Sequence, residues 1–240
     1  MPLTPGDMLR TQFAFLLFRP VRINLQRDFW RWFAFAVVVT WLAGLGRYWD
    51  HPSAELWQYL GLGSVAYIFC LSVLLYGIVR PVRPSNWGFR GVLIFVGLTS
   101  LPALLYAIPV ERFVELESAQ SINAWFLGAV AVWRVALLLR YLTTSARLHW
   151  FVAATVAVLL LSGIVVTLTL LNLEHVVFDL MAGIREQDAS PNDAAYRIVL
   201  NLAFISLLAF PVALIVYLAM VIRRQLASRD KAKRPEPTKE

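Results

Sequence analysis

Long apolar blocks separated by short polar connections make up most of this chain. Six blocks are long enough, at about 1.5 Å rise per residue, to cross a hydrocarbon layer of roughly 30 Å as helices. They are Phe29 to Gly46, Leu56 to Val79, Gly91 to Val110, Ile122 to Leu142, Trp150 to Leu171 and Ile198 to Ile222. The pattern predicts an all-α fold, a polytopic transmembrane helix bundle with six spans that occupies residues 29–222.

The basic residues alternate from one connection to the next, and this predicts the orientation of the bundle. Of the 22 Lys and Arg, 17 fall in connections and ends that six spans place on one side. Arg134 falls inside a span, and four lie on the opposite side, namely Arg47, Arg112, Arg185 and Arg197. Because Lys and Arg stay on the cytoplasmic side, both termini are predicted to be cytoplasmic. The expected location is the bacterial inner (cytoplasmic) membrane.

Composition agrees with a membrane location. The chain is 59% hydrophobic and 15% charged, whereas about a quarter of the residues of a soluble domain are charged. A net charge of +7 would suggest nucleic acid in a soluble protein, but here the basic residues lie beside apolar spans and no nucleic-acid partner is expected. Arg47 and Tyr48 follow the first block where a cleavage site would have small residues, so this block is expected to stay in the mature protein.

Three segments outside the spans have patterns of their own. Residues 1–28 are predicted to be a cytoplasmic lead-in, in which Gln12 to Phe18 is either a short interfacial helix or disordered. In the last exterior loop, Asn172 to Arg197, apolar residues at helical spacing predict an amphipathic helix followed by a polar loop. Residues 223–240 are rich in Lys, Arg, Pro and Glu, and they are predicted to form a basic disordered cytoplasmic tail.

Arg134 and Asn201 are the candidate intramembrane polar site. A charge inside a membrane is costly and is therefore a candidate for function. Arg134 lies six residues before Arg140, about 9 Å from the expected cytoplasmic interface. Three roles stay open for it: snorkelling to that interface, a structural bond to a neighbouring helix, and contact with a substrate or ion. Asn201, in the sixth span, can hydrogen-bond across helices.

Prolines mark three candidate helix kinks. Pro102 and Pro109 interrupt the third block, and Pro211 interrupts the sixth. Each proline frees a backbone carbonyl and bends its helix, which either lines a cavity or shapes the bundle. The third block, which contains two of them, is the best place to expect a broken helix.

Residues that could bind a metal gather only on the predicted exterior face. They are Asp50, His51, Glu174, His175 and Asp179. Imidazoles and carboxylates of this kind can bind a divalent cation, but they also form ordinary solvated rims at helix ends. The chain has no H-E-x-x-H, G-x-S-x-G, P-loop or G-x-G-x-x-G motif. We therefore expect no enzyme, no cofactor and no assigned metal site.

Part of the chain resembles a known family of membrane proteins. The residues are Gly91-Val92-Leu93-Ile94-Phe95, Leu101-Pro102, Ile108-Pro109 and Trp133. About a third of the chain is covered, and it is similar to the bacterial branch of the Yip1 family. The resemblance implies a cytoplasmic N-terminus, five or six helices and proline in a middle span. The Asp-Leu-Tyr-Gly-Pro sequence of the eukaryotic members is absent, and no functional residue is carried over.

The predicted bundle is smooth and apolar, with few buried polar groups. This favours a non-enzymatic scaffold or accessory subunit whose partners are membrane lipids and other membrane proteins. The alternative is a small permease or channel subunit with a path near Arg134, Pro102 and Asn201. The two differ in geometry, because a path requires these residues to converge on one cavity. The oligomeric state, a substrate and a pathway are not predicted.

Overall fold

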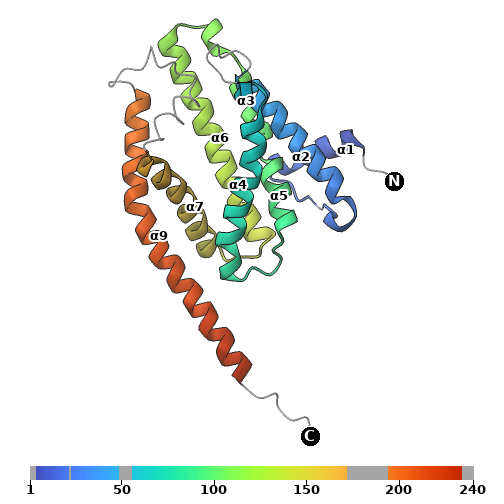
Figure 1. The fold of residues 1–240 in the computed structure, drawn as a ribbon, viewed down its shortest axis with the longest axis vertical. Helices are drawn as coiled ribbons and strands as arrows, with labels where there is room; N and C mark the ends of the chain where they lie inside the picture. The colour runs from blue at the N-terminus through green and yellow to red at the C-terminus, as the bar shows by residue number, and fades with distance from the viewer. Residues whose placement is uncertain (1–3, 22, 49–55, 172–193, 234–240) are drawn as a thin grey trace.

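The computed structural model describes residues 4–21, 23–48, 56–171 and 194–233, and every regular element in these ranges is helical. The α-helices are α1 (Pro5–Leu16), α2 (Leu25–Tyr48), α3 (Leu56–Tyr59), α4 (Leu62–Val79), α5 (Phe89–Leu98), α6 (Leu116–Thr144), α7 (Trp150–Leu170) and α9 (Ala194–Lys233). Three short 3-10 helices connect them: η1 (Arg80–Val82), η2 (Leu101–Ala107) and η3 (Val110–Arg112). Figure 1 shows the long helices side by side in one bundle.

Five helices are long and apolar enough to cross a membrane. These candidate spans are Leu25–Gly46, Leu62–Val82, Ser121–Thr144, Trp150–Leu170 and Leu200–Ala227. They match five of the six predicted blocks, so the prediction of an apolar helical bundle is confirmed. The third predicted block is not one helix. It is divided into α5, which has ten residues, and the 3-10 helices η2 and η3.

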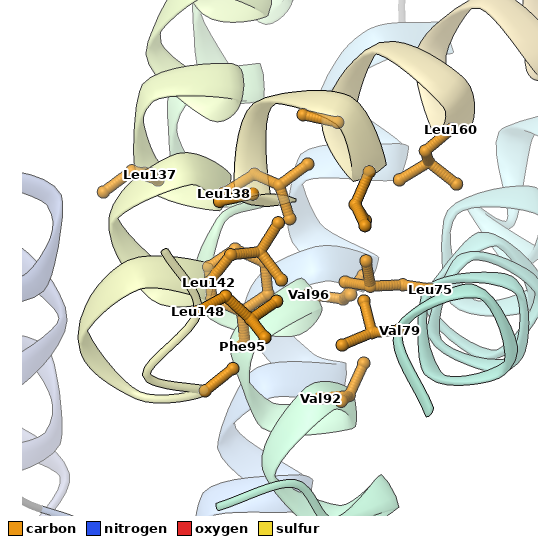
Figure 2. Packing of buried hydrophobic residues seen from close by; sticks show 14 of the residues in the cluster. Leu75, Val79, Val92, Phe95, Val96, Leu137, Leu138, Leu142, Leu148 and Leu160 are labelled. Atoms are coloured by element: carbon orange, nitrogen blue, oxygen red, sulfur yellow. The ribbon is translucent and has the colours of Figure 1, made fainter. Parts of the chain in front are cut away.

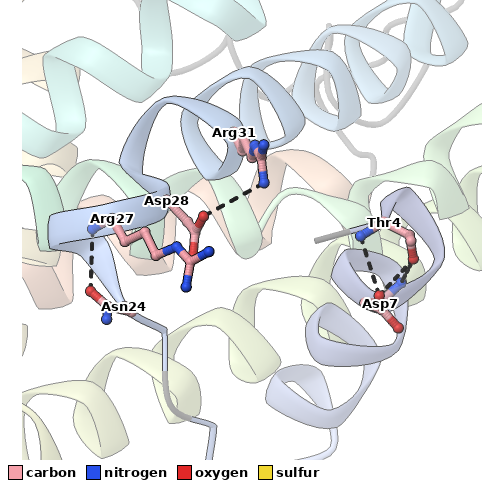
Figure 3. A network of polar contacts seen from close by, with 6 residues as sticks. All are labelled: Thr4, Asp7, Asn24, Arg27, Asp28 and Arg31. Atoms are coloured by element: carbon pink, nitrogen blue, oxygen red, sulfur yellow. Dashed lines mark hydrogen bonds and ion pairs between the residues drawn. The ribbon is translucent and has the colours of Figure 1, made fainter. Parts of the chain in front are cut away.

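Helix α1 begins at a complete capping box (Figure 3). The Thr4 hydroxyl donates to Asp7 Oδ2 at 2.6 Å, and the Asp7 backbone N–H donates to Thr4 Oγ1 at 3.2 Å. The hydrogen bonds from Thr4 to the carboxylate lower the pKa of Asp7. The stability that the box contributes is therefore present above the unfolded pKa of this carboxyl, and it is lost as the pH falls through the lowered value.

One face of α1 is buried against the rest of the bundle. Met8, Gln12 and Leu16 are buried, and Trp133 of α6 donates its indole N–H to the carbonyl of Leu16 at 2.9 Å. The predicted helix near Gln12 therefore exists, but it starts earlier in the chain. Its buried face packs on protein, so α1 is part of the core and not only a helix lying on lipid.

The start of α2 is set by local hydrogen bonds (Figure 3). The side-chain oxygen of Asn24 accepts the backbone N–H groups of Gln26 and Arg27 at 3.1 and 3.2 Å. Asp28 leaves helical geometry with φ −117° and ψ 18°, and its carboxylate pairs with Arg31 at 3.7 Å. The apolar part of α2 begins directly after this kink.

A glycine divides the second predicted span at its outer end. Gly61 adopts φ 64°, a left-handed conformation that suits glycine, and it separates the short α3 from α4. An added Cβ at Gly61 would lie 3.0 Å from the carbonyl oxygen of Trp41. The indole of Trp41 also donates to the carbonyl of Leu60 at 2.8 Å, so α2 holds this turn from the side.

Apolar side chains of most of the helices meet in one buried cluster, and Figure 2 shows part of it. Its central part comes from α4, α5, α6, α7 and the connection between α6 and α7, and includes Leu75, Val79, Val92, Phe95, Val96, Leu137, Leu138, Leu142, Leu148 and Leu160. Lipid tails are as apolar as leucine, so burial from lipid provides little free energy by itself. Close packing and hydrogen bonds between helices therefore decide how the bundle is held together.

Helix α9 lies along α7 and extends past the end of the bundle (Figure 1). Tyr217 donates its hydroxyl to the carbonyl of Ile78 at 2.7 Å, and the Arg224 guanidinium donates to the carbonyl of Val82. The helix continues to Lys233, so a disordered tail from residue 223 was wrong for 223–233. This segment is rich in good helix formers and elongates an existing helix without a new nucleus. Residues 234–240 lie outside the described ranges.

Helices α2 and α5 approach closely at Gly97, and this contact provides a stability test. A Cβ added there would lie 2.5 Å from the Cβ of Ala36, whereas a Cβ at Gly77 of α4 would meet nothing within 4 Å. We expect Gly97→Ala to destabilise the bundle by about 1–3 kcal/mol through overpacking. The matched Gly77→Ala should be neutral or stabilising by up to about 1 kcal/mol. Thermal unfolding in detergent measures both, and equal midpoints would contradict the close contact.

Candidate functional site

Proline accounts for the break at the end of α5. The helix ends at Leu98, and its cap residue Thr99 has φ −80° and ψ 0°. In a continued α-helix, the N–H of residue 102 would donate to the carbonyl of Leu98. Pro102 has no N–H, and in an α-helix its ring would clash with the carbonyl of Leu98. The chain therefore changes to the 3-10 helix η2, with Pro102 in its first turn.

Four backbone carbonyls, those of residues 96 to 99, lie at the end of α5. Hydroxyl groups near the break donate to the first two of them. Thr99 Oγ1 donates to the carbonyl of Val96 at 2.7 Å, and Ser100 Oγ donates to the carbonyl of Gly97 at 2.6 Å. Thr40 of α2 also donates to the carbonyl of Gly97, at 3.4 Å. A helix end leaves such carbonyls without the usual i→i−4 partners. Here the backbone N–H groups of Thr99 and Ser100 donate to Val96 and Gly97 at 3.3 and 3.1 Å, and the hydroxyl groups add to these bonds.

Side chains from distant parts of the chain satisfy the next two carbonyls. Gln12 of α1 donates its side-chain N–H to the carbonyl of Leu98 at 3.0 Å, and this carbonyl is the one that Pro102 leaves open. Arg134 of α6 donates its Nε–H to the carbonyl of Thr99, also at 3.0 Å. We call Gln12, Thr40, Gly97, Leu98, Thr99 and Arg134 the helix-break cluster.

The helix-break cluster lies near the middle of the bundle. Leu98 is nine residues from the start of α5, or about 14 Å along the helix. Arg134 is ten residues before the end of α6 at Thr144, or about 15 Å. This is close to half of a hydrocarbon layer of roughly 30 Å.

The electrostatics of Arg134 are favourable without a carboxylate partner. The end of a helix carries a partial negative charge of about half a unit, which attracts a cation. The guanidinium binds the carbonyl of Thr99 directly beyond this end. Its carbon also lies 6.0 Å from the ring centroid of Tyr67 on α4, within the range of a cation–π contact. Of the three roles open for Arg134, the structure shows the bond to a neighbouring element.

One polar atom of the cluster has no partner in the described structure. The side chain of Gln12 is fully buried, and its Oε1 accepts no hydrogen bond from any described residue. A buried amide oxygen in this state costs free energy. Two contributions offset this cost. The N–H group of Gln12 pairs with the carbonyl of Leu98, and the same helix places Met8 and Leu16 in the core.

The structure brings some of the predicted site residues together and separates others. Arg134 and the carbonyls before Pro102 meet in the helix-break cluster. Pro109 caps η3, one turn beyond η2. Asn201 is exposed on α9, which packs on α7 and η1, and Pro211 is exposed inside the same continuous helix. Arg134 and Asn201, the two residues of the candidate intramembrane polar site, are on different helices, and no described hydrogen bond joins them.

The exterior rim cannot be placed. Its residues Asp50, His51, Glu174, His175 and Asp179 lie outside the described ranges, as does the predicted amphipathic helix after Asn172. Within the described ranges, no group of three or more His, Cys, Asp or Glu is arranged to hold a metal ion. The rim remains a hypothesis from the sequence.

Sequence reasoning missed Gln12 and Thr40 as members of the cluster. A signal for Gln12 exists, since it lies four residues after Met8 and four before Leu16, which places an amide between apolar residues on one helix face. Polar groups in such surroundings need a partner. The identity of that partner, 86 residues further along the chain, is not contained in any local pattern.

The long apolar helices and the satisfied helix break define the class of this protein as a multi-pass helical membrane protein. No protein-family model, curated protein or solved structure matches the chain. The class therefore rests on the sequence and structure alone.

Replacement of Arg134 tests the cluster because a paired and an unpaired guanidinium predict stability changes of opposite sign. If the guanidinium pairs with the carbonyl of Thr99, Arg134→Met leaves that carbonyl unpaired and destabilises the bundle by about 1–3 kcal/mol. An unpaired intramembrane arginine would instead cost roughly 2.5–3.5 kcal/mol, so its removal would stabilise the protein. Unfolding in detergent gives the sign. Arg140→Met, on the same helix, is the control and should change stability little; stabilisation by Arg134→Met contradicts the cluster.

Proposed function

We propose that this chain is an integral protein of the bacterial inner membrane that crosses it six times, with both termini in the cytoplasm. Five passes are the long apolar helices. The third pass in chain order is α5 followed by η2, which have ten and seven residues. At about 1.5 and 2.0 Å per residue they span roughly 29 Å together, which is close to the thickness of the hydrocarbon layer.

Contacts between connections support this orientation. The backbone N–H of Ser85, between α4 and α5, donates to the carbonyl of Ala146, between α6 and α7. Arg224 near the end of α9 donates to the carbonyl of Val82 in the first of these connections. These segments therefore lie at one end of the bundle. That end carries Arg80, Arg83, Arg90, Arg147, Arg223 and Arg224, as the positive-inside rule requires of the cytoplasmic side.

The proposed role is a non-enzymatic one, as a scaffold or accessory subunit that acts through contacts with lipids and other membrane proteins. The observation that supports it most is the helix-break cluster. The carbonyls of Val96, Gly97, Leu98 and Thr99 each accept a hydrogen bond from a side chain of the protein. The protein's own side chains thus pair with these four carbonyls, and none of the four is left for a substrate to bind first. The resemblance to the bacterial Yip1 branch is compatible with this role and remains a prediction.

A permease or channel subunit is the second candidate, and the broken helix itself favours it. Transporters often have discontinuous helices near the membrane midplane, where half-helix ends bind ions and substrates. In this chain the path would pass Pro102 and Arg134, and the guanidinium would have to exchange its carbonyl partner for a substrate. Asn201 would not contribute, because it is exposed on α9 away from the break.

Reporter fusions test the six-pass topology. Fusions after Ser85 and Arg147 should report a cytoplasmic location, and fusions after Gln120 and Ser190 should report the opposite side. If the α5–η2 region did not cross the membrane, Ser85 and Gln120 would lie on the same side. A cytoplasmic signal at Gln120 or Ser190 contradicts the proposed topology.

Ion flux separates the two candidate roles. In vesicles reconstituted with the purified chain, a protein that acts by contact should give the Na⁺, K⁺ and H⁺ flux of empty vesicles, both as wild type and as Arg134→Ala. A permease would give wild-type flux that Arg134→Ala removes and Arg140→Ala keeps. The second result would replace the scaffold proposal with transport, provided that Arg134→Ala retains its helical content by circular dichroism.

A further inference from the structure

A cavity of about 470 Å³ lies between α1, α5, α6 and the segment that leads into α2. Its volume falls in the range of small-molecule sites, roughly 300–1,000 Å³. It adjoins the helix-break cluster, because Leu98 belongs to that cluster and also lines the cavity. The other lining residues are Phe15, Val21, Ile23, Leu25, Asn86, Gly88, Arg90, Gly91, Ile94, Phe95, Tyr141 and Ser145.

The walls of the cavity change from polar to apolar along α5. Asn86 and Arg90 lie at the start of α5, and Ser145 lies at the end of α6 beside them. The inner walls are apolar and include Phe95 and Leu98. From Arg90 to Leu98 the cavity follows α5 for eight residues, which is about 12 Å. One end therefore suits a polar group, and the rest suits a hydrocarbon chain.

Aromatic rings that pack on one another form part of the inner wall of the cavity. Phe95 stacks on Tyr141 of α6 with ring centroids 4.1 Å apart, and Phe15 of α1 meets Phe95 edge to face at 6.0 Å. Phe15 is held in place because α1 is tied to the bundle through Gln12 and the carbonyl of Leu16. The cavity is thus formed by three packed helices and not by a loop alone.

The polar end carries positive charge. Arg90 is exposed, its guanidinium lies 5.0 Å from the ring centroid of Phe29, and no described carboxylate pairs with it. The start of α5 has Gly88 as its cap, which provides no side-chain acceptor. A helix start of this kind adds partial positive charge to that of Arg90. Arginine binds phosphate through two parallel N–H bonds, which favours a phosphate group here.

We propose that this cavity binds an anionic phospholipid of the cytoplasmic leaflet, with its phosphate at Arg90 and the first part of one acyl chain along Ile94, Phe95 and Leu98. The inference rests on the proposed topology, which places the start of α5 at the cytoplasmic interface. A soluble phosphate compound shares the headgroup chemistry, but it would leave the apolar inner walls without a ligand. A phospholipid uses both ends of the cavity.

Native mass spectrometry of the full chain tests this site. The protein is purified in detergent, stripped of lipid and titrated with phosphatidylglycerol or phosphatidylcholine. The wild type should retain one phosphatidylglycerol and bind phosphatidylcholine more weakly. Arg90→Ala removes a charge-assisted phosphate contact and should weaken retention by about tenfold or more. Arg80→Ala is the matched control, since Arg80 is exposed in the connection that leads to α5 and lies over Tyr76 at 5.8 Å but does not line the cavity.

A second variant and a competitor distinguish the remaining outcomes. Ser145→Trp should narrow the cavity and reduce phosphatidylglycerol retention without removal of charge. Equal loss in Arg90→Ala and Arg80→Ala, equal binding of the two lipids, or full retention in Ser145→Trp would each overturn the site. Complete competition by millimolar glycerol 3-phosphate would assign the cavity to a soluble phosphate compound and overturn the lipid.

Reporter fusions on the same variants distinguish a failure of the lipid-site proposal from a failure of the proposed topology. If phosphatidylglycerol retention fails while fusions after Ser85 and Gln120 report opposite sides as expected, the lipid site alone is wrong. If the fusion after Ser85 reports the exterior, the orientation that both proposals share is wrong.

Discussion

The central constraint on this structure is a helix that ends inside the bundle. Backbone carbonyls at membrane depth have no water to bind, and each one without a partner costs several kcal/mol. The end of α5 meets this constraint with side chains from α1, α2 and α6, in which Gln12, Thr40 and Arg134 donate to the carbonyls around Leu98. The break therefore ties together helices that lipid alone would not drive to associate.

This arrangement links several features that would otherwise be unrelated. Pro102 prevents continuation of α5 and leaves the carbonyl of Leu98 without its usual helical partner. The buried side chain of Gln12 donates to this carbonyl. Gln12 in turn holds α1 against the bundle, and α1 forms one wall of the cavity next to α5 through Phe15. The carbonyl of Thr99 and the ring of Tyr67 replace water around the charge of Arg134. These two contacts thus explain the position of Arg134 without a role in transport.

The sequence predicts the parts of this fold that depend on local pattern. Five spans follow from the length of apolar blocks, and Pro102 marks the place where the remaining block breaks. The partners at the break do not follow, because the contacts of Gln12 with Leu98 and of Arg134 with Thr99 join segments 86 and 35 residues apart. Composition also misleads at residues 223–233, where charged residues continue α9 as a helix. The turn at Gly61 is missed since its left-handed backbone interrupts an unbroken apolar run.

The distance between Arg134 and Thr99 tests the central claim most directly. Solid-state NMR of the protein in lipid bilayers can measure the dipolar coupling between ¹⁵N at Arg134 Nε and ¹³C at the carbonyl of Thr99. With the nitrogen 3.0 Å from the carbonyl oxygen, the nitrogen and carbon should lie about 4 Å apart, and a clear coupling should be seen. Absence of that coupling, with the guanidinium coupled instead to lipid phosphate, would show that the helix break is not closed by Arg134.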